Sequence, residues 1–242
     1  METTTKPAFY AITWGRWGDY LSLLHLPYTV WHLSYVVLGA AVAPTVHLDR
    51  LGWSVLAFFL ATGIGAHALD ELRGRPLRTR VPGWFLGVSA AAAIGAAMGL
   101  GAVFSIRESS WFFLFIGAGA FMVVAYNLEL FGGLFHNRYW FALGWGVFPM
   151  ATGYWVSAQE ISFAAVLVGM ACFLLSLAQR SLSRNVRLLR RSARNVEGII
   201  VLNHGEVVKL DREWMVAAPE AALQLMSMTM AALSVGLLLS RV

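Results

Sequence analysis

Seven stretches of the chain, each about 20 residues or longer, contain no Asp, Glu, Lys or Arg, and they constrain the fold more than any other feature. Crossing the hydrocarbon of a bilayer takes about 20 predominantly apolar residues in a helix. The composition agrees, because 58% of the residues are hydrophobic and 13% are charged, against about 25% charged in soluble domains. The pattern predicts an all-α, polytopic membrane helix bundle that forms one domain over 1–242, with about seven spans at 20–46, 51–69, 83–106, 109–128, 139–159, 161–179 and 221–240.

Lys and Arg are unevenly distributed over the segments between these stretches. With a cytoplasmic N-terminus, the cytoplasmic segments carry 15 of the 18 basic residues, and the other side carries only Arg50, Arg107 and Arg241. Basic residues are retained on the cytoplasmic side of a membrane. The distribution therefore predicts an integral, multi-pass protein of the cell membrane, with the N-terminus in the cytoplasm and the C-terminus outside.

A basic cytoplasmic loop over 180–217 precedes the last predicted span. Its arginines are spaced by three and four residues, which places most of them on one helical face; they are Arg180, Arg184, Arg187, Arg190, Arg191 and Arg194. Such a face can bind anionic lipid headgroups, each arginine adding about 1 kcal/mol, or it can be an ordinary cytosolic extension of the helix. No aromatic residues are interleaved with the arginines, so nucleic acid is not an expected partner.

The second half of this loop has the pattern of a small hairpin. β-Branched residues flank Asn203-His204-Gly205 on both sides, and glycine favours a tight turn between two strands. We expect His204 to be a solvated turn residue.

The first candidate site closes the second predicted span. His67 lies one helical turn before Asp70 and Glu71, so the side chains share a face. Oxygen-rich ligands of this kind favour Mg²⁺ or Mn²⁺, and Arg75 and Arg78 can bind a phosphate through paired donors. The same residues also fit a salt-bridged helix end, in which neighbouring arginines neutralise the two carboxylates.

The second candidate site lies between the fourth and fifth predicted spans. Glu129 stands just inside the apolar boundary, and Tyr126, Asn127 and His136 lie close to it in sequence. Ionisable residues at this depth are costly and default to functional candidates. These residues either complete a site begun by the first cluster or form a hairpin turn in which Glu129 pairs with Arg138.

Two histidines fall within the first predicted span. His25 and His32 are seven residues apart and therefore share a helical face. Buried imidazoles of this kind can bind haem or a metal, although an interhelical hydrogen-bonded contact is the more common role for histidine in membranes.

The two clusters together resemble the first part of the UbiA-type intramembrane prenyltransferase superfamily, over roughly residues 20–160. Members of that family have an Asn/Asp-rich metal motif at the end of span two and a basic, proline-containing loop after it. They also have a Tyr-x-x-Lys-Arg segment after span four, followed by a Gly-rich span. The corresponding stretches are His67-x-x-Asp70-Glu71, Arg75-Pro76 and Val81-Pro82-Gly83, then Tyr126-Asn-Leu-Glu129-Leu130, Gly144-Trp-Gly146, Pro149 and Gly153-Tyr154.

The chain departs from the family pattern at three places. Glu129-Leu130 stands where the family has Lys-Arg, which reverses the local charge. Gln179-Arg180-Ser181 replaces the second Asp-rich motif after span six. Members usually have nine spans, against seven predicted here.

The resemblance implies transfer of a prenyl group from a prenyl diphosphate at a cytoplasmic-facing site with Mg²⁺. Asp70 and Glu71 would hold the metal, and arginines would stabilise the leaving diphosphate. The prenyl chain would lie among the Gly- and Ala-rich spans. The implied residues are His67, Asp70 and Glu71 for the metal, Asp70, Glu71, Tyr126 and Glu129 for catalysis, and Arg75, Arg78, Asn127 and His136 for substrate binding.

Two other functions fit the sequence. The missing second motif favours a non-catalytic protein that binds a lipid or isoprenoid, or an accessory subunit. An intramembrane metal hydrolase is a further alternative, with His67, Asp70, Glu129 and His136 as ligands. A retinal receptor is excluded, because its Schiff base needs a membrane lysine and the chain has only Lys6 and Lys209.

Overall fold

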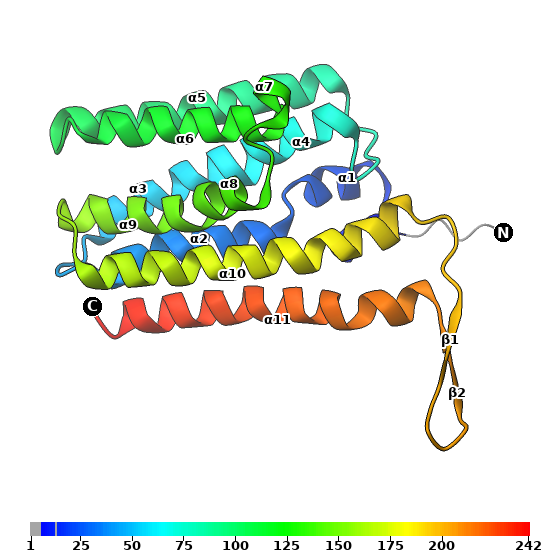
Figure 1. Cartoon of the computed structure of the whole chain (residues 1–242). Helices are drawn as coiled ribbons and strands as arrows, with labels where there is room; N and C mark the ends of the chain where they lie inside the picture. Colours follow the sequence, from blue (N-terminus) through cyan, green and yellow to red (C-terminus); the bar gives the residue numbers. More distant parts are fainter. Residues whose placement is uncertain (1–5, 13) are drawn as a thin grey trace.

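The computed structural model describes residues 6–12 and 14–242 and consists of long helices packed side by side, with one hairpin projecting from the bundle (Figure 1). The all-α class predicted from the sequence is confirmed. In chain order, with η for π-helical segments, the helices are α1 (Gly15–Leu23), α2 (Leu26–Ala41), α3 (Leu48–Phe58), η1 (Phe59–Ala66), α4 (His67–Gly74), α5 (Gly83–Arg107), α6 (Phe112–Asn127), α7 (Leu130–Gly133), α8 (Arg138–Ala142), η2 (Leu143–Val147), α9 (Phe148–Ala158), α10 (Phe163–Arg187), η3 (Leu188–Ser192) and α11 (Arg212–Leu239).

Within the described residues, five helical stretches are long and apolar enough to cross a membrane, which makes a polytopic bundle plausible. They are Gly15–Ala41, Leu48–Gly74, Gly83–Arg107, Phe163–Ser192 and Arg212–Leu239. The fourth and fifth predicted spans correspond to α6, which is apolar but shorter, and to the run from α8 to α9. The span number of seven and the cytoplasmic N-terminus stay predictions.

Helix α2 lies at the centre of the packing and contacts α9 and α11 most extensively. Its Trp31 and Tyr35 are fully buried, and the indole N–H of Trp31 donates to the Tyr35 hydroxyl at 2.7 Å. Against α9 the two backbones touch at glycines, since a Cβ built on Gly39 would lie 2.0 Å from the carbonyl oxygen of Met150. Small residues therefore bring these two helices together.

Local breaks in three of the long helical runs position the polar residues. His25 adopts a left-handed conformation (φ 43°) between α1 and α2. The π-helical segments η1 and η2 interrupt the runs that contain His67 and Trp145, and π turns of this kind recur at functional sites.

The loop between η3 and α11 carries the antiparallel hairpin that the sequence indicates. Strand β1 (Gly198–Val201) pairs with β2 (Val207–Leu210), with Gly198 opposite Leu210. Gly205 has φ 88° in the turn, a backbone conformation that glycine adopts without strain. His204 is exposed beside Glu206, with 3.0 Å between Nε2 and the carboxylate oxygen.

Candidate functional site

A polar pocket of about 320 Å³ lies at one end of the bundle, among α2, α4, α6, α10, η3 and the segment 7–10. It brings together side chains that are far apart in the sequence. Arginines come from α10 and η3, histidines from α2 and α4, a carboxylate from α4, and aromatic rings from α6 and the N-terminal segment. We call this cavity the polar pocket.

Arg180, Arg187 and Arg191 line one side of the pocket, and we call them the arginine wall. Their spacings of seven and four residues place them on one face of a continuous helical run. Arg180 lies over the ring of Phe141, with its guanidinium 5.6 Å from the ring centre. Arg191 donates from Nε to the carbonyl of Pro7 at 3.2 Å, so the N-terminal segment closes over this wall.

The rest of the arginine run has other surroundings. Arg190 is held by α11, since its Nε donates to Glu220 at 2.5 Å and its Nη1 to Glu213 at 3.0 Å. Arg184 and Arg194 are exposed. The predicted contact of Arg180–Arg194 with anionic headgroups stays a prediction, and the arginine wall faces the pocket.

Asp70 supplies one of the two carboxylates that line the pocket, and Glu129 supplies the other. Within the described part of the chain Asp70 has no hydrogen bond and no ion pair, although it shares the cavity with the arginine wall. His67 lies one turn before it, and its ring stacks on that of His25 with 4.0 Å between the centres. His67 and Asp70 are thus brought together, as the sequence predicts.

Glu71 has a different role from its neighbour. Its side chain is buried, and its carboxylate accepts hydrogen bonds from Thr79 N (2.8 Å), Thr79 Oγ1 (2.8 Å) and Leu77 N (2.9 Å). It thereby shapes the loop after α4. Arg75 and Arg78 belong to the same loop: Arg75 donates to the Val81 carbonyl at 2.6 Å, and Arg78 to the Arg191 carbonyl at 3.2 Å.

The second cluster lies in the pocket together with His67 and Asp70 of the first, whereas Glu71, Arg75 and Arg78 do not line it. Tyr126, Asn127, Glu129 and His136 all line it. The amide of Asn127 donates to the Val123 carbonyl at 2.7 Å. Tyr126 stacks on His136 with 4.5 Å between ring centres.

Glu129 pairs with Arg73 at 3.1 Å between Nη2 and Oε2, which differs from the sequence expectation of a pair with Arg138. Arg138 instead lies over the ring of its neighbour Tyr139, 4.7 Å from the ring centre. The loop reverses direction at Glu129, which has φ 50°, and this turn directs the carboxylate to the end of α4.

Three histidines of the pocket are fixed by main-chain carbonyls through Nδ1. His32 lies 2.8 Å from the Trp145 oxygen, His67 lies 3.2 Å from the Gly63 oxygen, and His136 lies 3.0 Å from the Tyr126 oxygen. Trp145 and Gly63 belong to η2 and η1, where π turns disturb the regular hydrogen-bond ladder.

Sequence reasoning did not assign Tyr10 and Tyr28 to the site. Both line the pocket, and their rings pack edge to face with 5.5 Å between centres. Burial raises the pKa of the Tyr10 phenol. Nothing in the sequence near Tyr10 marks it as a site residue, whereas the helical spacing of Arg180, Arg187 and Arg191 is a signal that could have placed them on one face.

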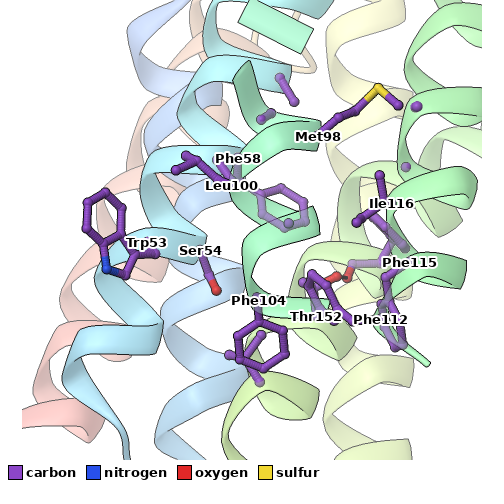
Figure 2. A pocket seen from close by; sticks show the side chains of 18 of the residues that line it. Trp53, Ser54, Phe58, Met98, Leu100, Phe104, Phe112, Phe115, Ile116 and Thr152 are labelled. Carbon is purple, nitrogen blue, oxygen red and sulfur yellow. Dashed lines mark hydrogen bonds between the residues drawn. The ribbon is translucent and has the colours of Figure 1, made fainter. Parts of the chain in front are cut away.

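An apolar cavity of about 380 Å³ lies among α3, η1, α5, α6 and α9 (Figure 2). Figure 2 shows its lining, which is mostly aromatic and aliphatic and includes Phe58, Met98, Phe104, Phe115 and Ile116. Charged residues lie at its α3 end, where Arg50 pairs with Glu108 at 2.5 Å. Trp145 lines this cavity and the polar pocket as well.

In comparisons with family models, curated proteins and solved structures, no match to this chain was found. Among the described residues, no group of three His, Cys, Asp or Glu side chains is arranged to hold a metal ion.

Proposed function

We propose that this protein is a UbiA-like membrane protein that binds an isoprenoid phosphate. The phosphate group would lie in the polar pocket and the isoprenoid hydrocarbon in the apolar cavity. The observation that carries the proposal is the arginine wall facing a cavity that adjoins an apolar one at Trp145. Guanidinium groups bind phosphate through paired, geometrically matched donors.

Electrostatics supports an anionic ligand. Burying a charged group without a partner is costly, and Arg187 is partly buried beside Arg180 and Arg191. Asp70 lines the same pocket, but among the described residues no hydrogen bond or salt bridge joins its carboxylate to these arginines. A phosphate between the two sides would offset the excess positive charge.

The orientation is part of the same proposal. The polar pocket lies at the end of the bundle that carries the loop 75–81 and the arginine run, and these segments supply most of the basic residues predicted to be cytoplasmic. The phosphate would therefore enter from the cytoplasmic side of a cell membrane, and the chain would extend toward the middle of the bilayer.

Replacing Arg187 with glutamine is expected to reduce copurified phosphate-bearing isoprenoid or lipid by about tenfold or more, since a charge-assisted hydrogen bond contributes about 1.5–3 kcal/mol. Mass spectrometry of the detergent-purified protein measures this directly. Lys209→Gln is the control, because Lys209 is an exposed basic residue on β2 that lines neither cavity. Equal ligand in Arg187→Gln and wild type would refute the assignment of the arginine wall.

Prenyl transfer is the second candidate, and the unpaired Asp70 carboxylate in the pocket favours it. Mg²⁺ often binds through one or two carboxylates together with substrate phosphates. Asp70 fits this role, whereas the carboxylate oxygens of Glu71 are occupied by Leu77 and Thr79. Bound Mg²⁺ would supply neutralisation of the diphosphate, and the arginine wall would stabilise its charge as the C–O bond of the prenyl diphosphate breaks.

Replacing Asp70 with asparagine is expected to abolish release of pyrophosphate from geranylgeranyl diphosphate in the presence of Mg²⁺, while expression is retained. The control is Glu160→Gln, at an exposed carboxylate that lines neither cavity. Full turnover by Asp70→Asn would exclude this carboxylate from the reaction. The hydrolase alternative has less support, because its four ligands form no metal-binding group among the described residues.

A further inference from the structure

The histidine side of the polar pocket presents hydrogen-bond acceptors that the phosphate does not use. A main-chain carbonyl can only accept a hydrogen bond, so the Nδ1 atoms of His32, His67 and His136 must be the donors in their contacts with carbonyl oxygens. In a neutral imidazole the other nitrogen, Nε2, then carries the lone pair and accepts. The backbone therefore fixes the same tautomer in each of the three rings.

The Nε2 atoms differ in what they contact. For His136 the partner is Arg180, whose Nη2 lies 3.3 Å away and donates. For His32 and His67 no partner of Nε2 exists among the described residues, and neither nitrogen is sealed inside the protein. His32 is only 2% exposed as a residue, but its Nε2 is not among the buried polar atoms without a partner, so this nitrogen is open to the pocket that His32 lines. Both nitrogens are therefore free to accept a hydrogen bond from a ligand donor in the pocket.

We propose that His32 and His67 form a hydroxyl subsite, which binds the O–H group of an alcohol or phenol beside the arginine wall. An ionised phosphate has no proton to donate to these nitrogens, and an arginine has no lone pair to accept an O–H proton. The two sides of the pocket therefore select different chemical groups. The ring of His25 stacks on His67 at 4.0 Å, and the ring of Tyr10 lies 4.9 Å from that of His25, so this side of the pocket has an aromatic lining.

The inference deepens the proposed function and rests on it, because it assigns the second group that the same pocket binds. In a prenyl transfer the hydroxyl would belong to the acceptor, and Nε2 of His67 would accept its proton as the new C–O bond forms and the diphosphate leaves. In a protein without catalysis, the subsite would bind an isoprenoid alcohol.

Two probes that carry the same prenyl group separate the subsites. Geranylgeraniol offers an O–H donor without charge, and geranylgeranyl monophosphate offers the anion. Dissociation constants are measured with the full chain in detergent. We expect His67→Phe to raise the Kd of the alcohol about tenfold and to change that of the phosphate less than about twofold. His67→Gln should restore alcohol binding, because the amide oxygen can replace the lost acceptor. Arg187→Gln should instead raise the Kd of the phosphate and leave that of the alcohol nearly unchanged.

His32→Phe serves as the second variant where His67→Phe does not fold. Unchanged alcohol binding in the variant that folds would overturn the hydroxyl subsite, while the loss of phosphate binding in Arg187→Gln would leave the proposed function intact. Unchanged phosphate binding in Arg187→Gln would instead refute the proposed function. Wild-type protein that binds neither probe would refute both.

Discussion

Replacing Gly153 with alanine is expected to lower the free energy of unfolding by about 4 kcal/mol or more, or to prevent folding. A Cβ at this position would lie 2.0 Å from the carbonyl oxygen of Val36, and one at Gly39 would lie 2.0 Å from that of Met150. Both obstacles are backbone atoms, which cannot rotate away as a side chain can. The two helices would have to separate along the contact that places α2 at the centre of the bundle.

The single cysteine of the chain provides the measurement. Cys172 is fully buried, so a thiol-reactive fluorescent dye reports its exposure during heating in detergent. Gly99→Ala is the matched control, since a Cβ on Gly99 of α5 meets nothing within 4 Å and alanine is the better helix former. Equal unfolding midpoints for Gly153→Ala and Gly99→Ala would contradict the assigned helix contact.

The helices could be predicted from the sequence because hydropathy and the absence of charge over about 20 residues dictate a spanning helix. Their mutual packing could not. The abundance of glycine and alanine in 83–106 points to close contacts there, yet Gly87, Gly95 and Gly99 face open space. The tightest contact involves α2 and α9, because in lipid a small residue on either face is equally compatible with hydropathy.

Only the part of the site whose residues are close together in the sequence could be predicted. His67 and Asp70 are one helical turn apart, so local geometry places them together. The return of Arg187 to the same pocket depends on how α10 packs, about which the sequence near Asp70 contains no information. Glu71 shows the limit of spacing arguments most clearly, because adjacent residues on a helix point in different directions. Only one of the two carboxylates lines the polar pocket.

Replacing Glu71 with alanine is expected to cost about 3–5 kcal/mol of stability, because it leaves buried donors of the loop 75–81 without an acceptor. The carboxylate accepts from Leu77 N, Thr79 N and Thr79 Oγ1. The loop also contains left-handed residues, Arg75 (φ 50°) and Arg78 (φ 56°), a conformation that non-glycine residues adopt only when the surroundings enforce it. Arg75 also holds this loop through the Val81 carbonyl, but among the described residues it is Glu71 that accepts from the N–H groups of Leu77 and Thr79.

Glu71→Gln should lose less stability than Glu71→Ala, since its amide oxygen can still accept from the loop, and the exposed Glu206→Gln is the control that should match wild type. The Cys172 dye assay measures all three. This pattern identifies Glu71 as the residue that fixes the loop whose Arg78 contacts the arginine wall at the Arg191 carbonyl. The opposite pattern, an unchanged unfolding midpoint together with loss of bound Mg²⁺, would return Glu71 to the metal-binding role that the sequence resemblance implies. The two roles are thus separated by one stability measurement, because a loop anchor stabilises the protein without metal and a metal ligand does so only with it.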